Sequence, residues 1–507
     1  MKRAWIAALI VSAALLLLFY NLGHYALWDD EALTALTALG VWETGDTTVR
    51  VGNNVVAYRG GAMIDGFQDR FSSPLQFYLA APFLGILGPS PLAARLPFAL
   101  CGFLGILLGL RWMWRSDLSP VALTVFGIAL LCTVEVFLFF RQCRYYAPAM
   151  LFTLALAYVW VEWTASRCYA AAVSALLCLL WLSSFLNLVA AVACLLVDHA
   201  LWGKRITARE ILIIVLPPAL LCALTLTVWN PLPRLVGVPL SVWLASKATL
   251  LLEAYRDLDR NEFFPGLLML AAPLVAWWRA APLMRPWCAV MVYVAAVTIA
   301  SPQYRGFTAD DVAFIRFYAP VLALTIPLGA MTILALANGR WLAIPLAVLA
   351  FGTTWLHPAP AQKNSPSTIA LFVDELRRPP SDPYTVASRW LNDNLTPGTT
   401  VWAMPPHAMY PLMFSAPRLV YGWQLQPEKR AQYPTLDSVH FFGLAPVDTI
   451  VAFADDPVLK RLPWRYERVA TLPVLGRDLF RPEIEWRTFR EVPIPDPALG
   501  IQIYERR

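Results

Sequence analysis

The sequence has few charged residues for its length. Of its 507 residues only 15% are charged, whereas 58% are hydrophobic, with a mean hydropathy of +0.56. A soluble protein of this size cannot bury so much apolar surface, and the apolar residues come in continuous blocks instead of at amphipathic spacing. The composition therefore argues against a soluble globular protein and predicts a polytopic α-helical membrane protein.

Several motifs of cofactor and metal binding are absent. The chain has no Walker-type phosphate loop and no glycine-rich dinucleotide motif. Its histidines are scattered without the spacing of metal ligands, so we expect no dedicated zinc site. No cofactor is expected with certainty, and a requirement for a divalent cation stays open. Group transfer would then draw on a pre-activated lipid donor. The five histidines are His24, His199, His357, His407 and His440.

Cysteine and charge narrow the class further. The eight cysteines lie between Cys101 and Cys288, in or beside apolar segments, so the polar C-terminal part needs no disulfides. The net charge of +6 spreads over loops and does not indicate a nucleic-acid partner. The chain contains no internal repeat.

The hydrophobic blocks predict about eleven transmembrane helices. Because Lys2 and Arg3 should face the cytoplasm, the first block is expected to be a retained span that runs outward. Residues 74–88 form an apolar segment of only about 15 residues, which suits a helix at the membrane interface. If that segment crossed, Arg111 and Arg115 would face outward against the charge bias. The expected spans are 5–22, 96–113, 121–140, 147–163, 169–182, 184–201, 211–229, 264–278, 287–300, 317–338 and 341–356.

This topology predicts two domains. Residues 1–356 would form a transmembrane catalytic domain with a long first external loop at 23–95 and further external loops at 230–261 and 301–316. Residues 357–507 would form an extracytoplasmic α/β domain, because proline and charge increase there and strand-like stretches begin. The expected elements are a helix at 384–395, a turn at 396–398, and strands at 399–404, 418–425, 449–454 and 468–475.

The sequence Trp28-Asp29-Asp30-Glu31 follows the first expected span directly. One interpretation is an ordinary helix start, with acids in the first turn interacting favourably with the helix dipole. The other is that one aspartate is a general base that removes a proton from an acceptor hydroxyl. Ionisable groups at a membrane boundary are costly to desolvate, and three adjacent acids exceed what a helix start requires.

Arginines and tyrosines gather where two later spans meet the external side. Arg141, Arg144 and Tyr145 follow the span at 121–140, and Arg316 ends the loop that also contains Arg305, Asp310 and Asp311. Arginine matches phosphate oxygens with a planar fork of donors, although anchoring at the interface is the alternative. Arg95 either anchors the long loop or contacts a lipid phosphate.

These motifs, in this order, resemble the GT-C class of membrane glycosyltransferases. In particular, they resemble the branch that contains the protein O-mannosyltransferases and the bacterial lipid A aminoarabinose transferase. The resemblance covers about residues 1–340. It rests on Asp30-Glu31, on Pro-Leu-x-x-Tyr at 74–78, on Gly-x-Ser-x-x-x-Ala-Arg-Leu-Pro at 88–97, on Arg144-Tyr145 and on the later Arg316-Phe317-Tyr318. Ser72-Ser73 departs from relatives that carry a basic residue or histidine before the proline.

The resemblance implies an inverting transfer of a sugar from a polyprenyl-phosphate donor to a lipid, glycan or protein acceptor on the external face. Asp30 would be the base, and Glu31 would orient the loop or bind the acceptor, with Asp29 beside them. Arg144, Arg95 and Arg316 would contact the donor phosphate or support the site, and Arg141 and Tyr145 accompany them. The expected location is the bacterial inner membrane, where membrane lipids surround the protein. The N-terminus would be cytoplasmic, and the active site and the C-terminal domain extracytoplasmic.

A transporter or flippase for a lipid-linked sugar is the alternative function. Such a protein would show charges at the membrane midplane and broken helices in repeated halves. Here most charges lie at one face and no repeat occurs, but Glu135, inside the span at 121–140, fits the alternative. A purely structural membrane subunit would leave the three acids without a purpose.

Overall fold

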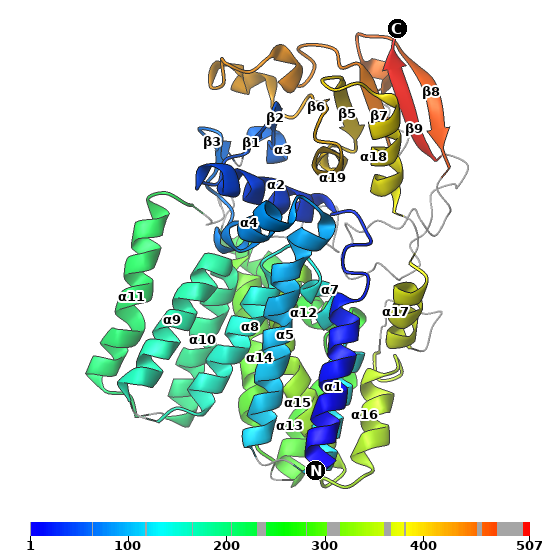
Figure 1. Cartoon of the computed structure of the whole chain (residues 1–507). Coiled ribbons are helices and arrows are strands. Elements are labelled where there is room, and N and C mark those ends of the chain that lie inside the picture. The colour runs from blue at the N-terminus through cyan, green and yellow to red at the C-terminus, as the bar shows by residue number, and fades with distance from the viewer. Residues whose placement is uncertain are drawn as a thin grey trace. The chain divides into compact units, whose positions relative to one another are not determined.

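The structure is a computed structural model (Figure 1), and it divides the chain into two compact units. One, here called the helical unit, consists of Met1–Tyr20 and Phe98–Arg377, and the other, the mixed unit, consists of Asn21–Pro97 and Arg378–Arg507. The predicted boundary at residue 356 between a membrane domain and an external domain stays a prediction. The structure describes residues 2–62, 64–116, 119–164, 166–203, 205–230, 240–279, 281–301, 315–358, 367–379, 382–453, 459–473 and 500–507.

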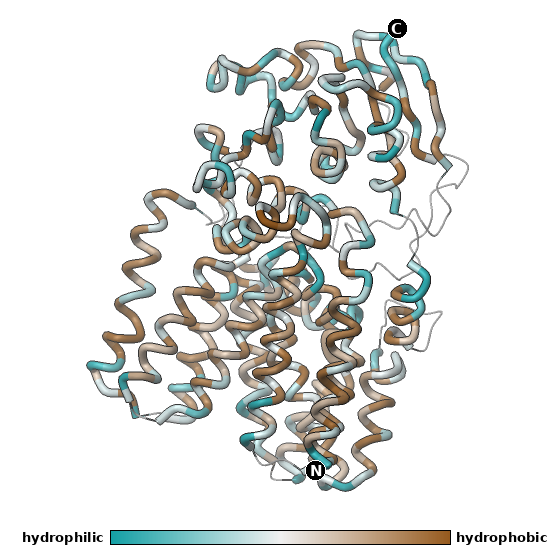
Figure 2. Tube along the Cα trace, viewed as in Figure 1, coloured by the Kyte–Doolittle hydropathy of each residue, from teal (hydrophilic) through white to brown (hydrophobic). Residues whose placement is uncertain are grey.

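The helical unit is a bundle of apolar helices, and its hydrophobic colouring is continuous along most of them (Figure 2). The boundary between the units falls inside one helix, α5. The helices are α1 (Lys2–Phe19), α5 (Pro91–Arg115), α6 (Pro120–Cys132), α7 (Val134–Phe140), α8 (Tyr146–Val161), α9 (Arg167–Ser183), α10 (Phe185–Trp202), α11 (Ala208–Leu226), α12 (Leu240–Arg260), α13 (Gly266–Arg279), α14 (Met284–Ala300), η1 (Ile315–Val321), α15 (Leu322–Leu336), α16 (Ala343–Phe351) and α17 (Thr368–Arg377).

Five helical segments of the described chain are long and apolar enough to cross a membrane, and the bent pair of α6 and α7 makes a sixth. Five more apolar helices are shorter, at 10–17 residues. The chain is therefore an integral membrane protein, while the count of eleven spans stays a prediction. The five long segments are Lys2–Phe19, Pro91–Arg115, Phe185–Trp202, Ala208–Leu226 and Ile315–Leu336.

The expected continuous span at 121–140 was wrong in one respect, because the helix breaks at Thr133. The axes of α6 and α7 meet there at 59°. The Thr133 hydroxyl donates to the carbonyl of Ala129 at 2.6 Å, a side-chain bond to the previous turn that competes with the helical ladder and bends helices. Glu135 lies in the first turn of α7 and is fully buried.

The expected external loop at 230–261 contains a helix that was not predicted, and its external location stays a prediction. Residues 240–260 form α12, whose buried positions include Lys247, Ala254 and Leu258. Lys247 and Ala254 are about two turns apart, and Ala254 and Leu258 about one turn, so they lie on the same face of the helix. The helix is therefore amphipathic and packs this face on the bundle. The ammonium of Lys247 ends at the last turn of α14, where it donates to the carbonyls of Thr298 at 2.8 Å and Ser301 at 2.6 Å.

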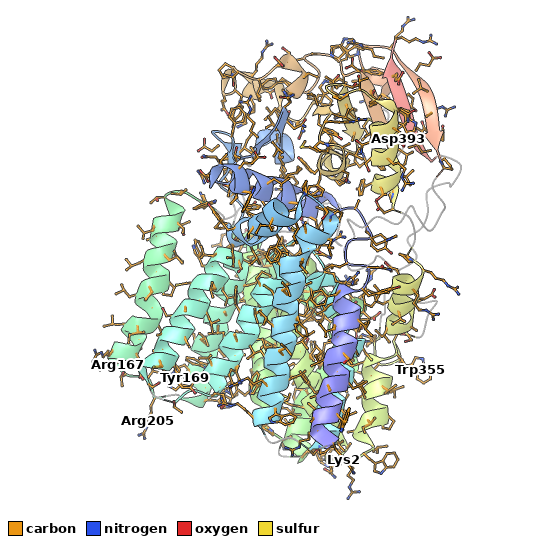
Figure 3. The ribbon with its side chains drawn as sticks, in the orientation of Figure 1. Lys2, Arg167, Tyr169, Arg205, Trp355 and Asp393 are labelled. Carbon is orange, nitrogen blue, oxygen red and sulfur yellow. The ribbon has the colours of Figure 1, made fainter. Side chains whose placement is uncertain are left out.

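Basic residues that the charge rule placed on one side lie together at one end of the bundle. Figure 3 shows Lys2, Arg167 and Arg205 at the same end. Arg115, at the end of α5, donates to the hydroxyl of Tyr158 at 2.7 Å, one turn before α8 ends and the chain leads to Arg167. The interfacial location of the segment at 74–88 and the orientation of the bundle stay predictions.

The mixed unit is built on a five-stranded sheet with the strand order β6-β5-β7-β9-β8. Strands β5 and β7 are parallel neighbours and almost entirely buried, whereas β8 forms an exposed edge. Helices α18 and α19 belong to the same part of the chain. The bounds are β5 (Thr400–Met404), β6 (Val420–Tyr421), β7 (Thr449–Ala452), β8 (Tyr466–Leu472), β9 (Ile501–Arg506), α18 (Pro383–Asn394) and α19 (Met409–Ser415).

The expected C-terminal elements are largely confirmed. The helix at 384–395 and the strands at 399–404 and 449–454 correspond to α18, β5 and β7 within two residues at each end. The strand at 418–425 was too long, because Trp423 has a φ of 55° and cannot continue a strand. Residues 474–475 of the last expected strand lie outside the described residues.

The first long loop folds together with the C-terminal sheet. Its elements are α2 (Asp29–Thr44), α3 (Tyr58–Gly61), α4 (Leu75–Leu87) and the hairpins β1 (Arg50–Val51) with β2 (Asn54–Val55) and β3 (Ile64–Asp65) with β4 (Gln68–Asp69). The buried Asn54 side chain donates to the carbonyl of Leu419 at 2.9 Å and accepts the Tyr421 amide at 2.7 Å. Helix α4 packs on α2, where a Cβ at Gly85 would lie 2.1 Å from the Trp42 ring.

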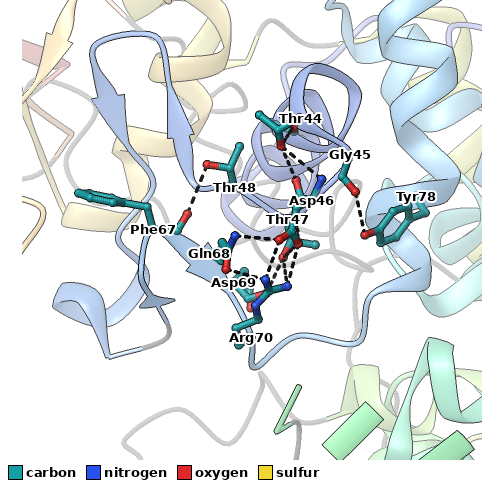
Figure 4. Close-up of polar contacts among 11 residues, drawn as sticks. Thr44, Gly45, Asp46, Thr47, Thr48, Phe67, Gln68, Asp69, Arg70 and Tyr78 are labelled. Atoms are coloured by element: carbon teal, nitrogen blue, oxygen red, sulfur yellow. Dashed lines mark hydrogen bonds and ion pairs between the residues drawn. The ribbon is translucent and has the colours of Figure 1, made fainter. Parts of the chain in front are cut away.

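An ion pair closes the loop after α2 (Figure 4). The two terminal nitrogens of Arg70 donate to the two carboxylate oxygens of Asp46, at 2.8 and 2.7 Å. The hydroxyl of Tyr78 on α4 donates to the carbonyl of Gly45 at 3.2 Å. The hydrogen bond from Arg70 holds the pKa of Asp46 below its ordinary value of 3.8.

This pair predicts a pH-dependent contribution to stability. Because the folded-state pKa of Asp46 is lowered, its contribution is present above pH 3.8 and is lost as the pH falls through the folded-state pKa. Asp46→Asn should therefore lower the thermal unfolding midpoint at pH 7 and have less effect near pH 3. Equal losses at both pH values would contradict the assignment. Asp65→Asn, at an exposed position of the same unit, is the control.

Candidate functional site

The three acids occupy the first turn of α2. Trp28 is the N-cap residue, and its carbonyl accepts the Ala32 amide at 2.8 Å. Asp29 is partly exposed, Asp30 is 4% exposed, and Glu31 is fully buried. The structure thus brings the predicted catalytic residues together, but it gives them different surroundings.

Glu31 forms a buried ion pair with Arg95 at the start of α5. The Nε and one terminal nitrogen of Arg95 donate to the two carboxylate oxygens at 2.9 and 2.6 Å. Arg95 is only 6% exposed. Bidentate, charge-assisted pairs of this kind are among the strongest polar contacts in proteins and fix orientation as well as charge. The pair fixes the first turn of α2 against α5.

All five N–H donors of Arg95 point at protein acceptors. Besides Glu31, the guanidinium donates to the carbonyls of Leu22 at 3.2 Å, Tyr25 at 2.9 Å and Ala26 at 2.9 Å. In this arrangement a phosphate could reach Arg95 only by displacing one of these bonds. The geometry favours Arg95 as a residue that positions the acids, and its role in donor binding stays a prediction.

The segment before the acids is held from a second side by Asp382. The Ala26 amide donates to the Asp382 carboxylate at 2.9 Å, while the Ala26 carbonyl accepts from Arg95. Asp382 also caps α18, where it accepts the Thr385 amide at 2.9 Å. Residues 356 positions apart in the chain therefore fix the approach to Asp29. Sequence reasoning missed Asp382, although an Asp-Pro pair before a helical pattern is a signal for an N-cap.

Arg141 lies in the helical unit and binds the end of α1. One terminal nitrogen donates to the carbonyls of Leu17, Leu18 and Tyr20, at 3.0, 3.0 and 2.8 Å. A cation at a helix C-terminus satisfies carbonyls that have no partner within the helix and interacts favourably with the dipole. Arg141 therefore has a clear structural contact. Its predicted contact with the donor phosphate stays a prediction.

Arg144 and Tyr145 form the short turn between α7 and α8. Arg144 is partly exposed, and its guanidinium lies over the Tyr145 ring at 5.7 Å. The ring centroids of Tyr145 and Tyr146 are 4.6 Å apart. The Phe139 centroid lies 5.0 Å from that of Tyr146 and 5.9 Å from that of Phe263. This buried aromatic packing fixes the turn that carries Arg144.

Arg316 is the second residue of η1 (Ile315–Val321), which packs on α8. Its guanidinium lies over the Phe317 ring at 5.8 Å. Tyr318 is buried and shares a hydrogen bond of 2.8 Å with Thr298 on α14. The packing of η1 on α8 brings the element of Arg316 into contact with the helix that Tyr145 directly precedes, within one unit. Arg305, Asp310 and Asp311 lie outside the described residues.

A buried aspartate–histidine pair of the helical unit was not found from the sequence. The Nδ1 of His357 lies 3.0 Å from a carboxylate oxygen of Asp259, and the same oxygen accepts the Gly266 amide at 2.7 Å. The two residues are 98 positions apart, so spacing gave no signal. Across the described residues, no group of three or more His, Cys, Asp or Glu side chains is placed to hold a metal ion.

Comparison with solved structures identifies the architecture. ArnT from Cupriavidus metallidurans bound to undecaprenyl phosphate matches with a TM-score of 0.56 and 14% identity over 99% of this chain and 98% of that one. The apo form of the same protein matches with a TM-score of 0.58 and 15% identity over 99% and 97%. This chain has the GT-C fold.

The other comparisons add little to the GT-C assignment. The apo oligosaccharyltransferase of Archaeoglobus fulgidus has a TM-score of 0.46 and 11% identity over 89% of this chain and 69% of that one. No family model and no curated protein matches the sequence. The predicted GT-C resemblance is therefore confirmed at the level of the fold.

Proposed function

We propose that this protein is an inverting glycosyltransferase that moves a sugar from a polyprenyl-phosphate donor to an acceptor on the external face of the membrane. The observation that carries the proposal is the full-length similarity of fold to ArnT, whose structure contains undecaprenyl phosphate. The order of acid and arginine motifs along the chain supports the same reaction. The expected setting is the bacterial inner membrane, with the N-terminus cytoplasmic.

The acids of the mixed unit would supply the base. In the reaction the acceptor oxygen forms a bond to the anomeric carbon, and the bond from that carbon to the phosphate oxygen breaks. The acceptor proton passes to a carboxylate, for which we propose Asp30, with Asp29 beside it. Glu31 is engaged by Arg95, so its role is to hold the first turn of α2 in place.

The arginines of the helical unit would stabilise the leaving group. The bond electrons go to polyprenyl phosphate, whose negative charge grows as the bond breaks. A fixed guanidinium beside that charge in a poorly hydrated region lowers the barrier. Arg144 is the foremost candidate, because its turn is fixed by aromatic packing and its side chain is partly exposed. Arg316 and Tyr145 are proposed to support it.

Arg144→Ala is predicted to weaken donor binding. Loss of a hydrogen bond to a charged phosphate should raise the Kd for undecaprenyl phosphate by about 10- to 100-fold. Equilibrium binding to the purified protein in detergent measures this directly. Arg209→Ala removes an exposed arginine at the start of α11 and should bind normally. An unchanged Kd for Arg144→Ala would count against its phosphate role.

A transporter or flippase is the second candidate, favoured by the bend at Thr133 and the buried Glu135. The two functions differ in chemistry. A glycosyltransferase in liposomes breaks the bond between sugar and phosphate, whereas a transporter returns the lipid-linked sugar intact. Chromatography of a radiolabelled donor distinguishes them after incubation with proteoliposomes into which the protein and source-membrane material have been reconstituted, with the detergent removed. Recovery of intact donor, together with its movement between leaflets, would overturn the proposed reaction.

A further inference from the structure

The C-terminal part of the mixed unit contributes a side chain to the surroundings of the acids. Helix α19 packs on α2, which begins with Asp29 and Asp30. Tyr410, the second residue of α19, is only 4% exposed. Its ring contacts that of Tyr58 on α3, with the centroids 6.3 Å apart. Helix α19, from the C-terminal part of the chain, therefore packs on the helix that carries the acids, and its Tyr410 contacts α3.

The Tyr410 phenol is neutral at physiological pH. Burial raises its pKa well above the ordinary value of 10.0, and the nearby Asp29, Tyr58 and Asp30 raise it further. Because both aspartates affect the pKa of Tyr410, its phenol lies close to their carboxylates.

A neutral phenol supplies what the aspartates cannot. An ionised carboxylate only accepts hydrogen bonds, whereas a phenol can donate one as well. An acceptor molecule whose hydroxyl gives its proton to a carboxylate still carries oxygen atoms that need a donor. We propose that Tyr410 is an acceptor-positioning residue, whose phenol binds an oxygen of the acceptor while the aspartates face its reacting hydroxyl. This inference rests on the proposed glycosyltransferase function.

Tyr410→Phe tests the proposal, because it removes only the hydroxyl and keeps the ring. Transfer from a radiolabelled polyprenyl-phosphate sugar would be measured while either the donor or a detergent extract of source membranes is varied. The extract serves as the acceptor probe. The concentration of extract giving half-maximal rate should rise about tenfold, as expected for a lost hydrogen bond. The half-saturating donor concentration should not change.

Tyr421→Phe is the matched control. Tyr421 is a fully buried tyrosine of the same unit whose hydroxyl donates to the Ala416 carbonyl at 3.3 Å, so its loss should leave both half-saturation values unchanged. The thermal unfolding midpoint of each variant is measured as well, and each variant is assayed at the same temperature interval below its own midpoint. Equal half-saturating extract concentrations for Tyr410→Phe, Tyr421→Phe and the unaltered protein would overturn the inference. An equal rise of the half-saturating donor and extract concentrations in Tyr410→Phe would overturn it too. Failure of the unaltered protein to consume any donor would instead overturn the proposed function.

Discussion

Replacing Asp30 with asparagine should abolish sugar transfer while leaving the protein folded and inserted in the membrane. Asparagine keeps the shape of the side chain but cannot take a proton. Loss of a general base typically costs about 10²–10⁴-fold in rate. The turnover of a radiolabelled polyprenyl-phosphate sugar by purified Asp30→Asn protein gives the value. Near-normal turnover would remove the catalytic assignment.

Two comparisons make the Asp30 result specific. Asp65→Asn alters an exposed acid on β3 of the same unit and should keep full activity. Asp29→Asn tests the neighbouring carboxylate, which is more exposed than Asp30. If Asp29→Asn were inactive and Asp30→Asn active, the base would be Asp29. The proposed sugar transfer would be unchanged, but the acceptor proton would pass to Asp29 instead of Asp30.

Breaking the Glu31–Arg95 pair should cost more stability than any other single polar substitution in the mixed unit. Glu31→Gln leaves the Arg95 guanidinium buried without its counter-charge, and removing one partner of a buried pair typically costs about 3–5 kcal/mol. The unfolding midpoint of purified protein in detergent should fall sharply. A midpoint within error of the unaltered protein would contradict the positioning role of Arg95.

An exposed ion pair in the same unit is the control for Glu31→Gln. Glu467 and Arg507 join β8 to the end of the chain at 2.6 Å, and both side chains are more than half exposed. Solvent and salt screen such a pair, so Glu467→Gln should leave the midpoint nearly unchanged. If both substitutions destabilised equally, burial would not explain the strength of the Glu31–Arg95 pair.

The fold could be predicted from the sequence where the signal is local. Continuous apolar blocks predicted α1, α8 and α14, and the spacing of Val386, Trp390 and Leu391 predicted α18. The block at 121–140 concealed a break because hydropathy does not register a side-chain hydrogen bond such as that of Thr133. Helix α12 was missed because a helix with one polar face has a low average hydropathy.

The candidate site shows the same division between local and distant information. Three adjacent acids drew attention to residues 29–31, and all three do lie in one helical turn. The different surroundings of Glu31 and Asp30 depend on Arg95, which is 64 residues beyond Glu31, and could not be read from local sequence. Asp382 and Tyr410 reach this region only because the C-terminal sheet folds with the first loop.

The most direct test of the proposed function is the fate of the donor. Purified protein would be incubated with a panel of radiolabelled polyprenyl-phosphate sugars and a detergent extract of source membranes, and free polyprenyl phosphate and labelled product would be measured together. We expect one sugar of the panel to be consumed, with one polyprenyl phosphate released for each sugar transferred. Recovery of every donor intact, under conditions in which the protein stays folded, would contradict the proposal.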